Sequence, residues 1–371
     1  MDQDSQQNNK VNQDADSSSQ NSNSVSAPTI SLPKGGGAIR GIGEKFAANP
    51  VTGTGSMTVP IATSPGRSGF GPQLSLAYDS GAGNGPFGFG WSLSLPAITR
   101  KTDKGLPQYR EAEESDVFVL SGAEDLVPVL EPDGSRFKDN TTAPDYTIHR
   151  YQPRIEGAFA RIERWTHRSN GDVHWRTISR DNILTLYGKG ADSRIADPED
   201  PNRIFSWLIC ETRDDKGNAV LYGYKAEDGV GADVSRVHER NRGDPDDLRR
   251  TANRYLKRIR YGNVEPLLDN GRRPRFLTEP EISNTEWMFE VVFDYGEHDL
   301  DAPKPDDQGQ WTFRDDPFSS YRPGFEVRTT RLCRRVLMFH HFPDDGSLIG
   351  ESYDGLVRSP EADRVVCGER A

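Results

Sequence analysis

The chain has 371 residues, only 33% of them apolar, and it contains 36 glycines and 25 prolines. This composition is typical of many short strands joined by turns and argues against a helical bundle. The formal net charge of −11 comes from 57 acidic and 46 basic residues that are interspersed, which argues against a basic face for nucleic acid. The cysteines, Cys210, Cys333 and Cys367, are too few and too scattered for a disulfide framework or a zinc site.

The first segment is polar. Residues 1–27 are mostly Gln, Asn, Ser and Asp, with hardly any side chain to bury, so we expect a disordered tail. A plain solvated extension is favoured over a secretion or docking signal. The tail lacks the basic-then-apolar order of a signal peptide, and no apolar run in the chain approaches the ~18 residues of a membrane span. Any export is therefore expected to use another route.

Short alternating runs follow in a glycine-rich segment. Residues 57–61, 74–78 and 91–95 each place apolar side chains at every second position, which is the period of a half-buried strand. The glycine cluster at residues 81–91 could allow backbone amides to approach a phosphate. A phosphate loop must lead into a helix, however, and this cluster leads into the alternating run at 91–95. We therefore interpret the cluster as turns.

The middle of the chain predicts hairpins. Residues 165–168 and 173–176 are strand-like runs joined through Asn170-Gly171, which is the strongest short hairpin signal. Residues 204–211 and 219–225 are a second such pair. Single strands are predicted at 255–261 and 287–295.

Between these strands, helical composition is plausible only at residues 246–260, and even there the apolar period is poor. The acidic, proline-containing segments 196–202, 244–247 and 299–308 are interpreted as surface loops. The hairpins come without amphipathic helices between them, which predicts an antiparallel sheet. The predicted fold is an all-β, elongated, antiparallel assembly of several sheets and hairpins, with no clear domain boundary after residue 27.

Several longer runs follow one another in a fixed order, at residues 28–46, 53–56, 65–67, 74–81, 87–91, 321–329 and 334–340. In this order they resemble the SpvB/TcaC amino-terminal domain family, and the resemblance covers residues 28–359.

In that family the domain opens the B component of Tc insecticidal toxin complexes or forms the front half of an SpvB-type virulence protein. The resemblance implies that B-component homologues continue into a β-propeller and Rhs/YD-repeat strands, which build a shell around a toxic payload together with a C component. The segments 215–224 and 255–263 are similar to Rhs/YD-type repeats.

The resemblance predicts a non-catalytic scaffold module of a Tc or SpvB-type toxin, working with the propeller and Rhs-repeat continuation and with the C and A components. An alternative is a fragment of an ADP-ribosylating toxin without its catalytic domain. We expect synthesis in the cytoplasm and release without a signal peptide. Residues 360–371 depart from the family pattern, which leaves open a truncated, frameshifted or stand-alone copy. An unfinished strand edge at residues 328–341 then predicts a homodimer or a separately encoded partner.

An enzyme is the main alternative to a scaffold. Glu111-Ala112-Glu113 has the Glu-x-Glu spacing of ADP-ribosyltransferases, but the accompanying Ser-Thr-Ser is missing and a two-residue spacing is a weak motif. His340 and His341 follow a strand, so their side chains should point to opposite faces and cannot share a metal. The acidic loop 299–307 lacks the alternating ligand spacing of a calcium site. No catalytic, cofactor-binding or metal-binding residue is predicted.

Two groups of residues have both a plain and a functional interpretation. The basic run at residues 328–335 is interpreted as a solvated strand face rather than a phosphate site. Tryptophans in alternating patterns are interpreted as core, although an exposed stripe would suit a glycan-binding β-module. These tryptophans are Trp91, Trp165, Trp175, Trp207 and Trp287.

Overall fold

The computed structural model describes residues 45–49, 53–113, 115–121, 124–155, 157, 159–240, 242–244, 246–341 and 355–356. The predicted tail at 1–27 and the segment 360–371 lie outside these residues. Strands make up 43% of the structure and helices 6%. Every strand pairing that the structure describes is antiparallel. The predicted antiparallel all-β fold is confirmed.

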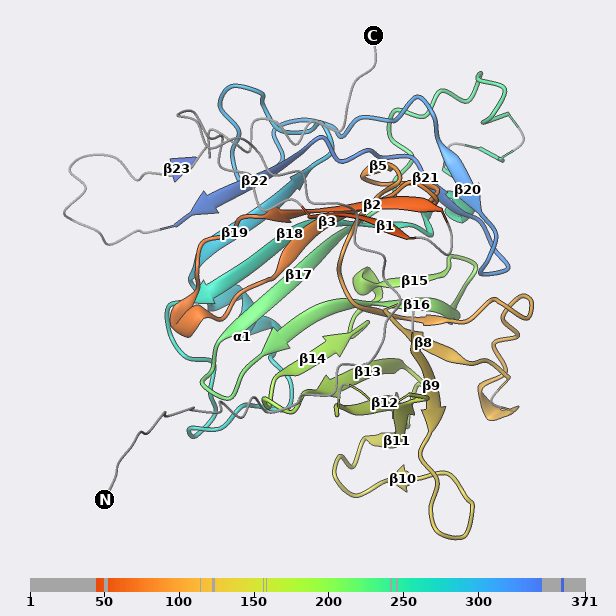
Figure 1. The fold of residues 1–371 in the computed structure, drawn as a ribbon, viewed down its shortest axis with the longest axis vertical. Coiled ribbons are helices and arrows are strands. Elements are labelled where there is room, and N and C mark those ends of the chain that lie inside the picture. The colour runs from red at the N-terminus through yellow and green to blue at the C-terminus, as the bar shows by residue number, and fades with distance from the viewer. Residues whose placement is uncertain are drawn as a thin grey trace, which may run out of the picture.

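Eight strands of the largest sheet close into a barrel (Figure 1). The ring closes through β16, a strand of 14 residues. Residues 206–208 of β16 pair with β7, and residues 209–213 pair with β14. In ring order the strands are β14 (Leu184–Tyr187), β13 (Val173–Ile178), β12 (Arg161–His167), β11 (Tyr146–Pro153), β9 (Glu124–Pro128), β8 (Phe118–Leu120), β7 (Ala97–Arg100) and β16 (Asp200–Arg213). This closure was not predicted from the sequence.

Aromatic side chains fill the barrel. An eight-stranded barrel has an interior just wide enough for side chains. The Phe118 ring packs against Trp175 and Trp207, with ring centroids 4.9 and 5.8 Å apart. Both tryptophans and Ile98 are fully buried. Burial of one large apolar side chain contributes about 1.5–3 kcal/mol, so these rings are a main source of barrel stability.

The same sheet continues beyond the barrel. Residues 211–213 of β16 also pair with β17, and the remaining strands follow in order. These are β17 (Ala219–Ala226), β18 (Arg254–Asn263), β19 (Trp287–Asp294), β22 (Arg335–His340) and β23 (Gly355–Leu356). Two short strands pair along β11 and β16, namely β10 (Lys138–Asp139) and β15 (Arg194–Asp197).

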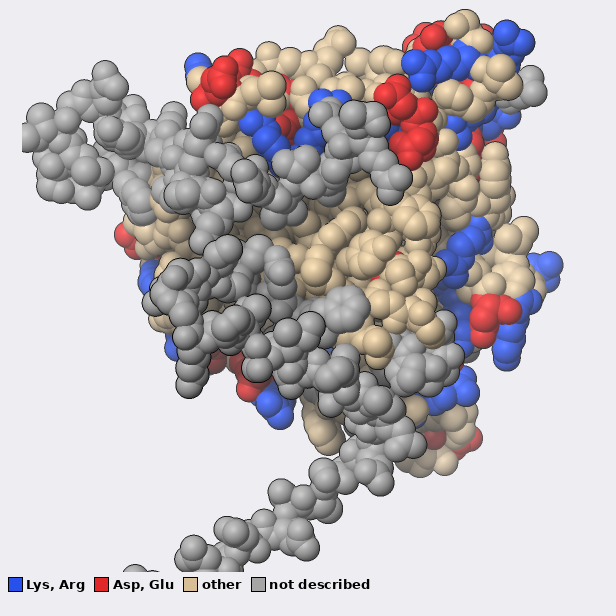
Figure 2. Space-filling view, turned by 45° about the horizontal axis from the view of Figure 1, so that its top comes forward, with Lys and Arg blue, Asp and Glu red and all other residues tan. Residues whose placement is uncertain are grey.

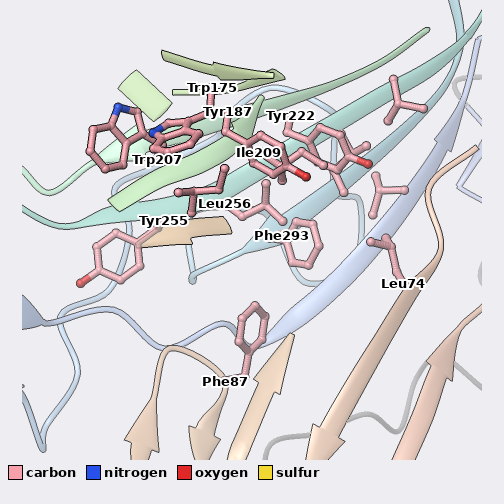
Figure 3. Close-up of a cluster of buried hydrophobic side chains, with 14 of the residues drawn as sticks. Leu74, Phe87, Trp175, Tyr187, Trp207, Ile209, Tyr222, Tyr255, Leu256 and Phe293 are labelled. Atoms are coloured by element: carbon pink, nitrogen blue, oxygen red, sulfur yellow. The ribbon is translucent and has the colours of Figure 1, made fainter. Parts of the chain in front are cut away.

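A four-stranded sheet crosses the β17–β19 region (Figure 1). Its strands are β1 (Lys45–Asn49), β2 (Thr54–Ile61), β3 (Leu74–Asp79) and β6 (Trp91–Leu93). Figure 3 shows Leu74 and Phe87 on one side of the core and Phe293 of β19 on the other, with Phe87 and Phe293 ring centroids 6.1 Å apart. The two sheets therefore form one sandwich whose core is continuous with the barrel core.

The remaining elements are short. The two-stranded ribbons are β4 (Asn84–Gly85) with β5 (Gly88–Phe89), and β20 (Phe318–Ser320) with β21 (Val327–Thr329). The helix α1 (Glu279–Asn284) begins with a capping box in which Thr278 and Glu281 bond each other's backbone. Single 3-10 turns lie at Arg67–Gly69, Glu111–Glu113, Ala191–Ser193 and Leu248–Thr251.

The predicted hairpins are confirmed. β12 and β13 pair around the Asn170-Gly171 turn, and Gly171 has a φ of +73°. β16 and β17 pair around Gly217, whose φ is +83° and whose added Cβ would lie 2.9 Å from the Leu267 nitrogen. Only glycine meets both demands there. The glycine cluster at 81–91 leads into the strand β6, as expected, and not into a helix.

Residues 246–260, where the apolar period is poor for a helix, contain a 3-10 turn and then enter β18, which confirms the strand predicted at 255–261. One prediction about a connecting segment was wrong. Residues 196–202 are not a loop, because β15 and β16 continue almost to a tight turn at Asp197 and Asp200. Residues 299–308 contain no helix or strand, as predicted.

Candidate functional site

The Glu-x-Glu carboxylates lie at one end of the barrel, in the connection between β7 and β8. Glu111 accepts hydrogen bonds from Arg100 of β7 and Arg164 of β12, one on each carboxylate oxygen. Both guanidinium groups are buried, whereas 38% of the Glu111 side chain is exposed. Arg100 also donates to Asp116 at 2.7 Å. Glu111 thus closes a buried ion-pair cluster that ties the connection to the barrel wall.

This arrangement does not suit a transferase. Both oxygens of Glu111 are already bound by guanidinium groups, so neither is presented to a substrate. Glu113 points to solvent and pairs with the exposed Arg110 at 3.1 Å. A catalytic pair would need both carboxylates to converge on one reacting group.

Behind Glu111 lies a cavity of about 150 Å³, which we call the barrel-end pocket. Its floor includes the rings of Phe118 and Tyr151. Two carboxylates, Glu111 and Asp116, face it together with five guanidinium groups. The arginines are Arg100, Arg110, Arg136, Arg154 and Arg164. Sequence reasoning missed this convergence, because the arginines come from connections and strands far apart in the chain.

A second cluster has the composition of a metal site. Potential ligand atoms of Asp294, Glu297 and His298 lie within 4.8 Å of one another, and all three residues are buried. The Lys257 ammonium occupies the position of a cation: it contacts Glu297 and lies 2.7 Å from the His298 Nε2. Burial and the nearby Lys257 charge both lower the pKa of His298. Lys257 therefore supplies a positive charge to the cluster as part of a buried ion pair.

The basic run at 328–335 is not a solvated strand face, and that interpretation was wrong for its buried members. Arg328 donates to Glu239 at 2.7 Å, and Arg331 donates to Glu227 at 3.0 Å. Arg331 is fully buried and lies over the Trp311 ring at 4.2 Å. These pairs fix the connection between β17 and β18 to β21 and to the segment that follows it.

The histidines and the acidic loop also have internal partners. The His340 Nε2 lies 2.8 Å from the Ser64 hydroxyl, while the His341 Nε2 lies 3.3 Å from a carboxylate oxygen of Glu290. In the loop at 299–308, the Asp299 carboxylate accepts two backbone N–H groups. Asp307 pairs with Lys225 and Lys257.

Most of the tryptophans are core residues, as the plain interpretation held. Trp165, Trp175, Trp207 and Trp287 are each at most 8% exposed. Trp91 is half-buried and lies against Tyr78, with ring centroids 5.2 Å apart. Four of the five rings are therefore unavailable for an exposed glycan-binding stripe.

The described part of one face carries mixed charge. Figure 2 shows Lys and Arg beside Asp and Glu at the edges of this face, with residues of neither kind between them. This part of the face does not provide the clustered cations that a phosphate backbone requires. Among the described helices, none is both long and apolar enough to cross a membrane.

Comparison with known proteins places the chain in a family. The family model described as Salmonella virulence plasmid 65kDa B protein matches residues 49–342. The Mono(ADP-ribosyl)transferase SpvB of Salmonella typhimurium is 39% identical over 336 residues, and that of Salmonella choleraesuis strain SC-B67 is 40% identical over 337. Each alignment covers 88% of this chain but 52% of the relative. The chain thus spans about half the length of these curated relatives.

The comparison with solved structures supports the same family. The N-terminal domain of effector protein SpvB from Salmonella typhimurium strain LT2 is 38% identical, with a TM-score of 0.66 over 79% of this chain and 91% of that domain. TcdB2-TccC3 is 34% identical, with a TM-score of 0.71 over 88% of this chain and 15% of that one. The Photorhabdus luminescens Tc holotoxin pore is 34% identical, with a TM-score of 0.70 and the same coverage. The chain therefore belongs to the Salmonella virulence plasmid 65kDa B protein family, and its fold is that of the SpvB N-terminal domain.

Proposed function

We propose that the chain is a non-catalytic scaffold module of a toxin or virulence protein, contributing to the shell that carries a toxic payload. One observation carries this proposal. The same β module accounts for 91% of the solved SpvB N-terminal domain and for 15% of the TcdB2-TccC3 chain. A module that recurs as a minor part of a much larger toxin chain suits a structural role better than a self-contained catalytic one.

The chemistry of the described residues supports the same proposal. The carboxylates that sequence or geometry would nominate for catalysis or metal binding are held by cations of the chain itself. Glu111 is held by two arginines and Glu297 by Lys257. Burial raises the pKa of the Cys210 thiol to about 12, which makes it a poor nucleophile at neutral pH.

The test is transfer of labelled ADP-ribose. The purified chain is incubated with labelled NAD and acceptor proteins that include actin, beside a full-length relative named as a transferase and beside the Glu113→Ala variant. We expect label on the acceptor with the full-length relative only. Transfer by the wild-type chain that disappears in Glu113→Ala would overturn the non-catalytic assignment.

We propose further that the module assembles with other toxin-complex components, through strand pairing at β22. One edge of β22 pairs with β19 along its whole length. On its other edge, β23 pairs only with Phe339 and His340. Among the described strands, none pairs with residues 335–338 on that edge. An open edge of this kind offers backbone donors and acceptors to an added strand. The partner expected is a chain with propeller or Rhs-repeat sequence, or a second copy of this chain.

Light scattering after size-exclusion chromatography tests this assembly, together with amide exchange across residues 328–341. We expect a dimer, or a complex with the product of a neighbouring reading frame, and slower exchange in this segment when the partner is added. A monomer that ignores such a product and already exchanges slowly throughout the segment would contradict the edge-pairing proposal.

We also propose that the chain acts after release from the bacterium, as part of an effector or toxin complex, with the module at residues 28–359. Fractionation of a producing culture tests this. The chain should occur in the medium as well as in the cytoplasm, whereas retention of all of it inside intact cells would count against release.

A further inference from the structure

One segment of the connection between β18 and β19 lies against the barrel without being part of its sheet. We call this segment, residues 269–277, the strap. It contains no helix or strand. It is fixed at both ends: just before it the Leu267 N–H donates to the Gly217 carbonyl at 2.9 Å, and just after it Thr278 caps α1.

Between these ends, barrel side chains hold the strap by its backbone carbonyls. The Lys189 ammonium donates to the Leu277 carbonyl at 2.7 Å, and the Arg213 guanidinium donates to the Pro274 carbonyl at 2.9 Å. These bonds take the place of a strand ladder. The strap can therefore open locally while the sheet beneath it stays paired.

The strap covers a histidine on the outer face of the barrel. Trp175 of β13 lies in the barrel core, and successive side chains of a strand alternate, so His174 points outward. The Phe276 ring of the strap packs on three rings there, at centroid distances of 5.5, 5.8 and 5.9 Å from His174, Tyr146 and Trp165. His174 is only 2% exposed, and its Nε2 has no hydrogen-bond partner among the described residues. The closed strap thus keeps water from an unpaired ring nitrogen.

Charged groups around His174 disfavour its protonation. Arg176 and Lys189 add positive charge, whereas the Asp172 carboxylate, which favours protonation, is bound on both oxygens by Arg194 at 2.5 and 2.9 Å. Burial is the largest cause, and together with these cations it lowers the pKa of His174 to about 3. Other charged or titratable groups on the elements packed here are Tyr146 on β11, Glu163 with Arg161 and His167 on β12, Glu211 with Arg213 on β16, and Arg275 on the strap.

We propose that the strap is an acid-released device, in which protonation of His174 lifts residues 269–277 from the barrel and uncovers the rings of Tyr146 and Trp165. A charged imidazole needs water or an acceptor at each ring nitrogen, and the closed strap denies water to Nε2. The open form presents an aromatic surface at acid pH that the closed form hides. This proposal goes beyond the scaffold function and does not depend on it.

The two forms of the strap differ in the pKa of His174, which gives the size of the effect. With the strap open the ring titrates near its ordinary pKa of 6.5, and with the strap closed near 3. The closed form has the lower pKa, so it is favoured above pH 6.5 and loses this advantage as the pH falls. At pH 5 the ratio of open to closed strap should be about 30-fold higher than at pH 7.5.

The experiment measures how often the strap opens through a cysteine placed beneath it. Leu277 is 2% exposed, so Leu277→Cys reports opening. Its labelling by dithiodipyridine is followed by mass spectrometry and divided, at each pH, by that of a free peptide of residues 272–281. The ratio should rise about 30-fold from pH 7.5 to pH 5. Adding His174→Phe, which keeps a ring that cannot be protonated, should limit the rise to less than about threefold. His167→Phe replaces a half-buried histidine beside Tyr146, at a centroid distance of 5.0 Å, and is the matched control that should keep the full rise.

A reciprocal measurement does not require His174 to be replaced. Phe276→Ala removes the ring that seals the site and lets water reach the imidazole. In an NMR titration, the pKa of His174 should then lie at least one unit above its wild-type value, because burial is the main cause of its low pKa.

Four results would overturn the proposal. They are a rise of less than about threefold at Leu277→Cys, a full rise that survives His174→Phe, a rise that His167→Phe abolishes, and an unchanged His174 pKa in Phe276→Ala. Equal deprotection of the native Cys333 thiol, which is buried in the sandwich core, would show opening of the whole fold and would also overturn it. If His174→Phe fails to fold, the Phe276→Ala titration decides.

Discussion

Replacing Glu239 should test whether buried ion pairs hold the long connection between β17 and β18 in place. The Glu239 side chain is fully buried. Its carboxylate accepts hydrogen bonds at 2.7 Å from Arg242 and Arg250 within the connection, and from Arg328 of β21. Glu239→Gln keeps the shape of the side chain but leaves three guanidinium groups around a neutral amide.

The pKa of Glu239 gives the size of the expected loss of stability. Burial opposes ionisation, but the hydrogen bonds from Arg250 and Arg242 outweigh it and lower the pKa from 4.5 to about 2. This difference corresponds to about 3 kcal/mol of stability at neutral pH. The folded-state pKa is the lower one, so this stability is present above pH 4.5 and is lost as the pH falls toward 2. Breaking a buried charge pair costs a similar ~3–5 kcal/mol.

Urea unfolding followed by tryptophan fluorescence measures the effect. At pH 7 and pH 5, Glu239→Gln should be less stable than wild type by about 3 kcal/mol, and the difference should shrink at pH 3.5. Asp181→Asn removes an exposed charge whose pair with Arg180 spans 3.9 Å, and should cost less than ~1 kcal/mol. A Glu239→Gln variant whose free energy of unfolding lies within 0.5 kcal/mol of wild type at pH 7 would refute the reasoning. A loss that small is what an exposed ion pair contributes, which is about 0–1 kcal/mol.

Three further predictions concern single sites. Gly188→Ala should lower the melting temperature, because Gly188 has a φ of +61° and an added Cβ would lie 2.3 Å from the Trp207 ring. Gly171→Ala shares the positive φ of +73° but has open space, and should cost less. Lys257→Met should destabilise the chain by ~3–5 kcal/mol in urea unfolding, because it leaves a buried carboxylate unpaired; an unchanged midpoint would count against the ion pair. Burial lowers the pKa of His174 to about 3, so NMR should find this ring neutral at pH 5, and stability should fall as the pH drops from 6.5 toward 3.

The hairpins could be predicted from sequence because their signals are local. The Asn170-Gly171 dipeptide favours the backbone conformation of a tight turn without help from distant residues. The alternating residues on either side of it then pair directly across that turn. The same reasoning located β3 and β17. It also located the strand at 255–261, which is part of β18 and buries Tyr255 and Ile259 in the sheet core. It failed at residues 196–202, where β15 and β16 continue almost to a tight turn.

Closure of the barrel could not be predicted, because it depends on pairings between distant segments. β7 pairs with β16 over more than a hundred residues of chain, as in the contact of Thr99 with Ser206. The residue pattern of neither strand indicates which other strand it pairs with. The barrel-end pocket has the same origin, since Arg100 and Arg164 meet Glu111 only once the ring has closed.

The buried charges explain how a chain with so few apolar residues keeps long connections in place. Glu227 and Glu239 lie in a connection of about 27 residues, whose described part contains a single 3-10 turn as its regular structure. Each is bound by an arginine from residues 328–331. A buried ion pair adds little net stability compared with an apolar replacement, because both charges must be desolvated. It does penalise any alternative placement, in which one charge would stay buried without its partner. These pairs therefore act mainly on the geometry of the connection, which is what the proposed scaffold function would require.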